Sequence, residues 1–209
     1  MRAMRLLGTF AALALAGCSA GYVKNSEADV SLFITALNGG EVFRSDVRTG
    51  NNSEQVFADN VTVSLSNRSK NPNVTELQVA RAIDIERYTV RYFRGDGRNT
   101  EGVDVPYPIS GALRTVIDVG NNSDVELQLV RAQAKLDPPL TNLRRGSPGP
   151  LPNPTLTPSL NLVLSVFAEI TVYGRTTSGK SVSASGQMQI DFSDYAEGSN
   201  VGATTGGQQ

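Results

Sequence analysis

The residues from Gly174 to Ser181 match a pattern that many proteins use to hold phosphate groups. The stretch reads Gly174-Arg-Thr-Thr-Ser-Gly179-Lys180-Ser181 and fits G-x-x-x-x-G-K-[ST]. In a working site of this kind, the loop backbone and the lysine hold the phosphates of a nucleotide, and the hydroxyl side chain binds Mg²⁺. A helix must begin at the end of the motif, because its free N–H groups and its dipole hold the anion.

The sequence around the motif predicts strands instead of a helix. Apolar residues alternate with mostly polar ones on both sides, at Leu160, Leu162, Leu164, Val166, Ala168, Ile170 and Val172 and again at Val182, Ala184, Met188, Ile190 and Phe192. A period of two is typical of half-buried strands. We therefore expect a long β-hairpin from Leu160 to Phe192, with a turn of Thr177, Ser178 and a left-handed Gly179.

In that hairpin Gly174, Gly179, Lys180 and Ser181 belong to a turn and bind no cofactor, which leaves nucleotide binding as a remote alternative. Other catalytic sets are scarce. The chain has no histidine, which excludes Ser-His-Asp and Cys-His catalysis and histidine-containing zinc sites within it. No serine is followed three residues later by lysine, the pattern of penicillin-interacting enzymes. Carboxylates remain, so a glycoside hydrolase of the cell envelope that uses two of them is the second hypothesis.

Two further patterns have ordinary explanations. Oxygen-rich turns that could bind calcium occur at Asp96, Asn99 and Asp104 and at Asn121, Asn122 and Asp124. Neither set has the ligand spacing of an EF-hand loop, and Asn and Asp are common turn residues, so we predict no metal site. The tripeptide Arg94-Gly95-Asp96 is one that integrin-binding proteins display, but we interpret it as a strand arginine followed by a turn at Gly95-Asp96-Gly97.

The first residues have the features of an export signal. Arg2 and Arg5 precede an apolar run from Leu6 to Ala16, which is too short to span a bilayer. The run ends in Leu15-Ala16-Gly17-Cys18, which resembles the lipobox of bacterial lipoproteins. The resemblance implies cleavage before Cys18 and acylation of Cys18, which is the sole cysteine of the chain. Ser19 stands where the signal for retention in the inner membrane would have aspartate, so the outer membrane is the implied destination.

Composition divides the chain into four parts: a signal peptide at residues 1–17, a lipidated cysteine and tether at 18–29, one β domain at 30–195, and a disordered tail at 196–209. Val, Ile, Thr, Ser, Gly and Asn fill short blocks separated by turn residues, which is typical of an all-β domain. The net charge is −1, with acidic and basic residues interspersed. Nothing in this balance indicates binding to nucleic acid.

Strand predictions within the β domain follow from alternation and turn residues. Besides the hairpin, they are Val30 to Leu37, Val61 to Ser66, Ile83 to Tyr92 with a bulge near Glu86 and Arg87, Leu113 to Val119, and Val125 to Ala134, where a short helix is the alternative. We expect residues 41–52 to be turn-rich. Because prolines restrict the backbone, we expect Pro138 to Pro158 to form a long, extended loop.

These blocks predict an antiparallel β-sandwich of about seven or eight strands. Their number and spacing resemble immunoglobulin-like and fibronectin type III-like domains, although the paired cysteines and core tryptophan of antibody domains are absent. We therefore expect a protein without catalytic activity or cofactor, anchored to the membrane by acylated Cys18. Its partner would be an envelope protein or polysaccharide. Open sheet edges and the proline-rich loop are the expected contact surfaces.

Overall fold

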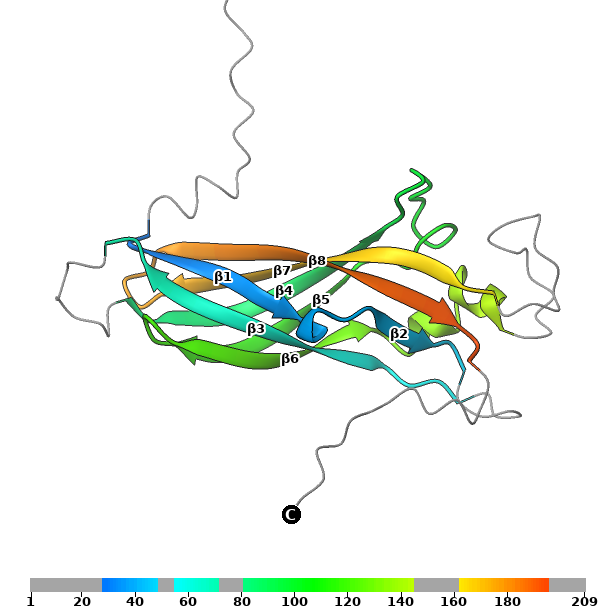
Figure 1. The fold of residues 1–209 in the computed structure, drawn as a ribbon, viewed down its shortest axis with the longest axis horizontal. Coiled ribbons are helices and arrows are strands. Elements are labelled where there is room, and N and C mark those ends of the chain that lie inside the picture. The colour runs from blue at the N-terminus through cyan, green and yellow to red at the C-terminus, as the bar shows by residue number, and fades with distance from the viewer. Residues whose placement is uncertain (1–27, 49–54, 72–80, 145–161, 196–209) are drawn as a thin grey trace, which may run out of the picture.

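A computed structural model describes residues 28–48, 55–71, 81–144 and 162–195 of the chain (Figure 1). The regular structure of these residues is β-strand, apart from short 3₁₀ turns at Asn38–Gly40, Gln133–Lys135 and Leu140–Leu143. The prediction of an all-β fold is therefore confirmed. In this part of the chain, no helix has the length and the apolar character that crossing a membrane requires. The signal peptide, Cys18 and the tail at 196–209 lie outside the described residues.

The strands form two sheets that pack into a sandwich (Figure 1). The smaller sheet has the order β1-β3-β6 and contains β1 (Val30–Leu37), β3 (Asp59–Ser69) and β6 (Asn122–Val130). The larger sheet has the order β2-β8-β7-β4-β5 and contains β2 (Phe43–Asp46), β4 (Ile83–Phe93), β5 (Ile109–Ile117), β7 (Leu164–Thr176) and β8 (Ser181–Ser193). Neighbours are antiparallel except β2, which runs parallel to β8.

The core lies between the sheets and is built by alternation along the strands. On β7, Val166, Ala168, Ile170 and Val172 are buried, whereas the residues between them are exposed or half-buried. Buried residues of β3 and β6, among them Leu65, face them from the smaller sheet. Each strand thus presents one apolar side to the opposite sheet, as the period of two predicts.

The predicted bulge is confirmed at the expected place. The pairing of β4 shifts between Ile85 and Arg87 against both of its neighbours, β5 and β7. An extra residue reverses the side on which later residues point. For this reason Ile85 and Tyr88, which differ in parity, are both buried.

Three predictions need correction. Residues 41–52 were expected to be turn-rich, but Phe43–Asp46 forms β2 by pairing with the end of β8. The stretch from Val125 to Ala134 is a strand only in its first part. β6 ends at Val130, and a 3₁₀ turn begins at Gln133. The proline-rich segment is not extended at its start, where Leu140–Leu143 forms a 3₁₀ turn. Burial of both leucines in the core explains this turn, and residues 145–158 of the segment lie outside the described residues.

Candidate functional site: a groove beside an open strand edge

The phosphate-binding pattern lies at the tip of the β7–β8 hairpin. The Thr176 N–H donates to the Lys180 oxygen at 2.8 Å, and the Gly179 N–H donates to the Thr176 oxygen at 2.7 Å. Gly179 has a φ of 85°, which glycine adopts without strain. The predicted turn of Thr177, Ser178 and left-handed Gly179 is confirmed, but the expectation that Gly174 belongs to the turn is wrong, because Gly174 lies within β7. Ser181 begins a strand, so no helix N-terminus is present to hold a phosphate at this position.

The first glycine of the motif has a packing role. A Cβ atom on Gly174 would lie 2.6 Å from the Asp84 backbone oxygen on β4. Only a residue without a side chain lets the two strands approach this closely. Lys180 and Ser181 are exposed. The hairpin therefore accounts for both glycines of the pattern without a nucleotide.

The loop after β4 holds the first set of calcium candidates. The Arg94 Nε donates to Asp96 Oδ1 at 3.0 Å, and the Arg98 Nε donates to Asp96 Oδ2 at 3.2 Å. The hydrogen bond from Arg94 is the main reason that the pKa of Asp96 is lowered. Asn99 Oδ1 accepts the Arg94 N–H at 2.6 Å, and Asp104 Oδ2 accepts the Thr100 N–H at 3.2 Å. Each of these three side chains therefore accepts a hydrogen bond from a donor within the loop.

That loop also contains the integrin-type tripeptide. The Gly97 N–H donates to the Arg94 oxygen at 3.4 Å, which confirms the predicted turn. The Asp96 carboxylate is held by the arginine of the same tripeptide. In the second set, Asn122 accepts a hydrogen bond from Arg68 at 3.2 Å. Among the described residues, no group of three or more histidine, cysteine or acidic side chains could hold a metal ion.

Carboxyl groups also gather at one end of the sandwich. Lys135 Nζ lies 2.9 Å from Asp59 Oδ1, and Arg48 Nη2 lies 3.0 Å from Asp194 Oδ2. Asp46 Oδ1 accepts the backbone N–H of Arg48 at 3.1 Å. Burial is the largest cause of the raised pKa of Asp46, and nearby Asp194 adds to it. These carboxylates are bound to internal cations and N–H groups, which is typical of a structural ion-pair network and not of a free acid and base facing a substrate.

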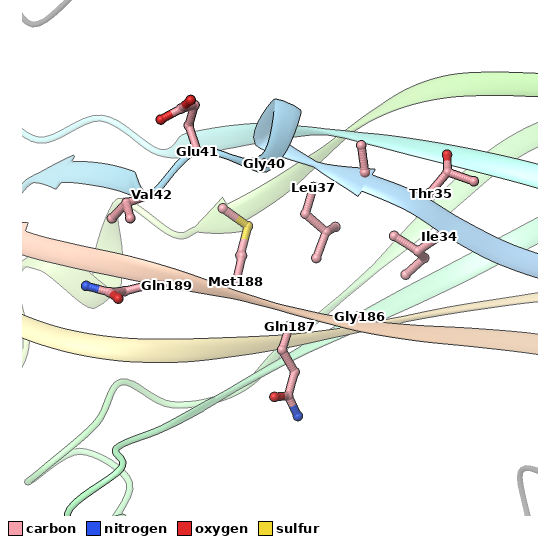
Figure 2. A pocket seen from close by; sticks show the side chains of 11 residues that line it. Ile34, Thr35, Leu37, Gly40, Glu41, Val42, Gly186, Gln187, Met188 and Gln189 are labelled. Carbon is pink, nitrogen blue, oxygen red and sulfur yellow. The ribbon is translucent and has the colours of Figure 1, made fainter.

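A groove with a volume of about 490 Å³ lies between β1 and β8 (Figure 2). We call it the β1–β8 groove; it is lined by residues 34–37, 40–42 and 186–189. Leu37 and Ile34 extend from β1 toward β8, and Met188 extends from β8 into the space between Leu37 and Val42. Gln187 points to the other side of the sheet. Apolar side chains therefore line part of the groove, beside the polar residues Thr35, Glu41 and Gln189.

The groove exists because the chain changes sheets. Asn38, Gly39 and Gly40 have φ values of 49°, 63° and 90°, and this left-handed turn leads from β1 in the smaller sheet to β2 in the larger one. Because β2 pairs only with Ile190 to Ser193, the same side of residues 185–189 has no strand partner in the described part of the chain. We call residues 185–189 the open edge of β8.

Sequence reasoning missed the β1–β8 groove. It depends on β2, which has too few residues to show alternation, and on contact between strands at opposite ends of the domain. The run Asn38-Gly39-Gly40 is the one local signal for it in the sequence. Asparagine and glycine adopt positive φ readily, so three of them in a row indicate a sharp change in chain direction.

The β1–β8 groove and the open edge can take up apolar side chains and form hydrogen bonds with another backbone. Glu41 is the one ionisable residue among those that line the groove. This arrangement is suited to binding a protein segment. No protein-family model matches the sequence, and a search of curated proteins also finds no match.

Proposed function

We propose that the protein is a lipid-anchored, extracytoplasmic β-sandwich that serves as a binding or structural component of a cell-envelope assembly, without catalysis. The observation that carries the proposal is the open edge of β8 beside the β1–β8 groove, into which Ile34, Leu37 and Met188 extend apolar side chains. An unpaired strand edge can bind another chain through main-chain hydrogen bonds, and a pocket beside it can select side chains. This chemistry favours a protein partner over a polysaccharide.

The strand order supports an immunoglobulin-like fold. In such domains two antiparallel sheets pack face to face, and Greek-key connections take the chain from one sheet to the other several times. Here β1, β3 and β6 form one sheet, whereas β4, β5, β7 and β8 belong to the other. The chain switches sheets at Asn38–Gly40, which puts β1 and β2 in different sheets. Domains of this kind are common as binding modules at cell surfaces.

The anchor rests on the sequence. The resemblance of Leu15-Ala16-Gly17-Cys18 to a lipobox implies acylated Cys18, which would attach the domain to the membrane, with the outer membrane as the proposed location. Several acyl chains on one residue give stable attachment, whereas a single chain gives marginal attachment. Ala28 is already buried in the core, so the tether between anchor and domain would be residues 18–27.

The carboxylate-dependent hydrolase receives no support from the described residues. Asp46 and Asp194 are near each other, but Asp194 forms an ion pair with Arg48 and Asp46 accepts backbone N–H groups. A glycosidase needs one carboxyl group to protonate the leaving oxygen and a second to attack or activate water. Removing these two from their internal partners would cost stability before any substrate was bound.

The proposal is tested by isolating the protein from membranes with mild detergent. We expect wild-type protein in the membrane fraction together with a partner in fixed stoichiometry. Cys18→Ala should appear in the soluble fraction, because the acylated residue is lost. Wild-type protein that is soluble, or membrane protein that is isolated alone and monomeric, would contradict the proposal.

A further inference from the structure

We propose that the open edge of β8 receives an extended peptide strand from a protein partner, and that this strand places an apolar side chain between Leu37 and Met188. The inference rests on the proposed function as a binding component and adds the class of partner. It is built from the directions of the backbone groups on β8, the geometry of β2 and the lining of the β1–β8 groove.

Backbone directions follow from the β7–β8 register. Thr176 donates its N–H to Lys180, and pairing continues without a shift along the hairpin. Antiparallel strands alternate between hydrogen-bonded and non-bonded pairs, so Gly186 and Met188 direct their N–H and C=O groups to β7. Ser185 and Gln187 direct theirs to the opposite side, which is the open edge.

The open edge continues an existing ladder. Phe43 pairs with Ile190 in the parallel β2–β8 ladder, so an extension of β2 in the N-terminal direction would run beside residues 185–189. The left-handed turn at Asn38–Gly40 takes this chain away to β1 instead. The outward N–H and C=O groups of Ser185 and Gln187 therefore lie in line with β2 but have no strand partner among the described residues. A helix has no free backbone groups along its length with which to pair.

The lining of the β1–β8 groove determines which side chains the incoming strand needs. Leu37 and Met188 are 8% and 7% exposed, so their unburied apolar surface is at the groove. Gly186 has no side chain, and a Cβ atom there would lie 3.1 Å from Leu37 Cδ1. The strand residue that faces inward should therefore be apolar. Because Glu41 is exposed at the rim, a basic residue nearby is favoured and an acidic one is disfavoured.

The test uses a synthetic peptide of alternating valine and threonine with lysine at each end, and a matched pair of variants, Gln187→Pro and Gln187→Ala. Proline removes the N–H that points to the open edge, whereas alanine keeps it. The Gln187 N–H forms no hydrogen bond with β7, so proline at this position breaks no bond of the β7–β8 ladder. Both variants should therefore fold, which circular dichroism will check. We expect wild type and Gln187→Ala to bind the peptide equally, and Gln187→Pro to bind it at least roughly tenfold more weakly.

Two further measurements keep the proposal falsifiable if Gln187→Pro fails to fold. Amide hydrogen exchange should slow at Ser185 and Gln187 when the peptide is added. Val42 is 45% exposed and lines the groove, so charge at this position should not disturb folding. Val42→Glu should strengthen binding of the lysine-ended peptide, because the new carboxylate attracts its lysines. Val42→Lys should weaken binding, because the new ammonium group repels them.

Several results would overturn the inference: protection confined to β1, equal binding by Gln187→Pro, or no response to charge at Val42. Self-association of the wild type that Gln187→Pro abolishes would assign the edge to a second copy of this chain. If a membrane partner stays bound to Gln187→Pro, the strand inference fails while the proposed function stands. If no partner copurifies but the peptide protects Ser185 and Gln187, the proposed function fails and the strand site stands.

Discussion

Lys135 Nζ lies 2.9 Å from Asp59 Oδ1, and this contact joins the turn after β6 to the first residue of β3. The Lys135 side chain is 2% exposed, and the Ser45 hydroxyl donates to the other oxygen of Asp59. An ammonium group at this depth is tolerated only when it is paired, because its desolvation costs several kcal/mol. The pair thus connects the small sheet, the turn and β2 at one end of the sandwich.

We expect Lys135→Met to lower the free energy of unfolding by about 3 kcal/mol, because it leaves the Asp59 carboxylate without its cation. The double variant Lys135→Met/Asp59→Leu should recover part of this loss, since neither charge then remains in the interior. Urea unfolding of wild type, both single variants and the double variant gives the coupling energy between the two residues. A coupling energy near zero would show that the pair does not hold the turn to β3.

Asn67 is a second buried polar residue, and its side chain connects β3 with β5 and with the segment just before β4. Its Nδ2 donates to the Arg81 oxygen and to the Ile117 oxygen, both at 2.9 Å. Asn67→Ala would leave these two carbonyl groups without that donor, so we expect a loss of about 2 kcal/mol or more. The exposed Asn60 on the same strand provides the control, because Asn60→Ala should change stability by less than about 0.5 kcal/mol. Similar losses for the two variants in thermal or urea unfolding would refute this role of Asn67.

The sequence predicts the hairpin well because two local signals agree there. Alternation fixes which side of each strand is buried, and Gly179 fixes where the chain turns. The bulge between Ile85 and Arg87 is predictable for a similar reason, since the apolar parity changes within one strand. In both cases the information lies within a few residues of the feature.

Features that depend on distant contacts are not predictable in this way. Phe43–Asp46 becomes a strand only because Ile190 to Ser193 is beside it. Lys135 lies in a polar stretch, where a lysine is expected at the surface. Its side chain is buried instead, because it pairs with Asp59 at the end of the domain where Leu140 and Leu143 of the next turn are also buried. The β1–β8 groove likewise depends on the packing of the first strand against the last. The residues near each feature in the sequence do not indicate which distant residues it will contact.

The phosphate-binding pattern provides a test of the hairpin interpretation. Gly174→Ala should destabilise the protein by about 1–3 kcal/mol, because the added Cβ atom meets the Asp84 oxygen on β4 and backbone must move. Lys180→Ala should change stability by less than about 0.5 kcal/mol, since this side chain is exposed. Neither variant should alter binding of ATP with Mg²⁺, measured by calorimetry. ATP binding by wild type that Lys180→Ala abolishes would restore the nucleotide interpretation.

Asp46 and Asp96 should affect stability with opposite pH dependence. The pKa of Asp46 is raised from 3.8, mainly by burial, so its contribution is complete below 3.8 and is lost as pH rises through the folded-state pKa. The pKa of Asp96 is lowered from 3.8, mainly by its hydrogen bond to Arg94, so its contribution is present above 3.8 and is lost as pH falls through the folded-state pKa. Compared with wild type, Asp46→Asn should therefore gain stability at neutral pH relative to acidic pH, and Asp96→Asn should lose it.

NMR titration of the two side-chain carboxyl carbons measures both shifts directly. Added salt separates their causes: the Asp96 pKa should move toward 3.8 because its ion pairs are exposed to solvent. The Asp46 pKa should change less, because burial is its main cause. Titration of Asp46 below 3.8 would show that burial is not the dominant effect on its pKa, and titration of Asp96 above 3.8 would show that the hydrogen bond from Arg94 does not control its pKa.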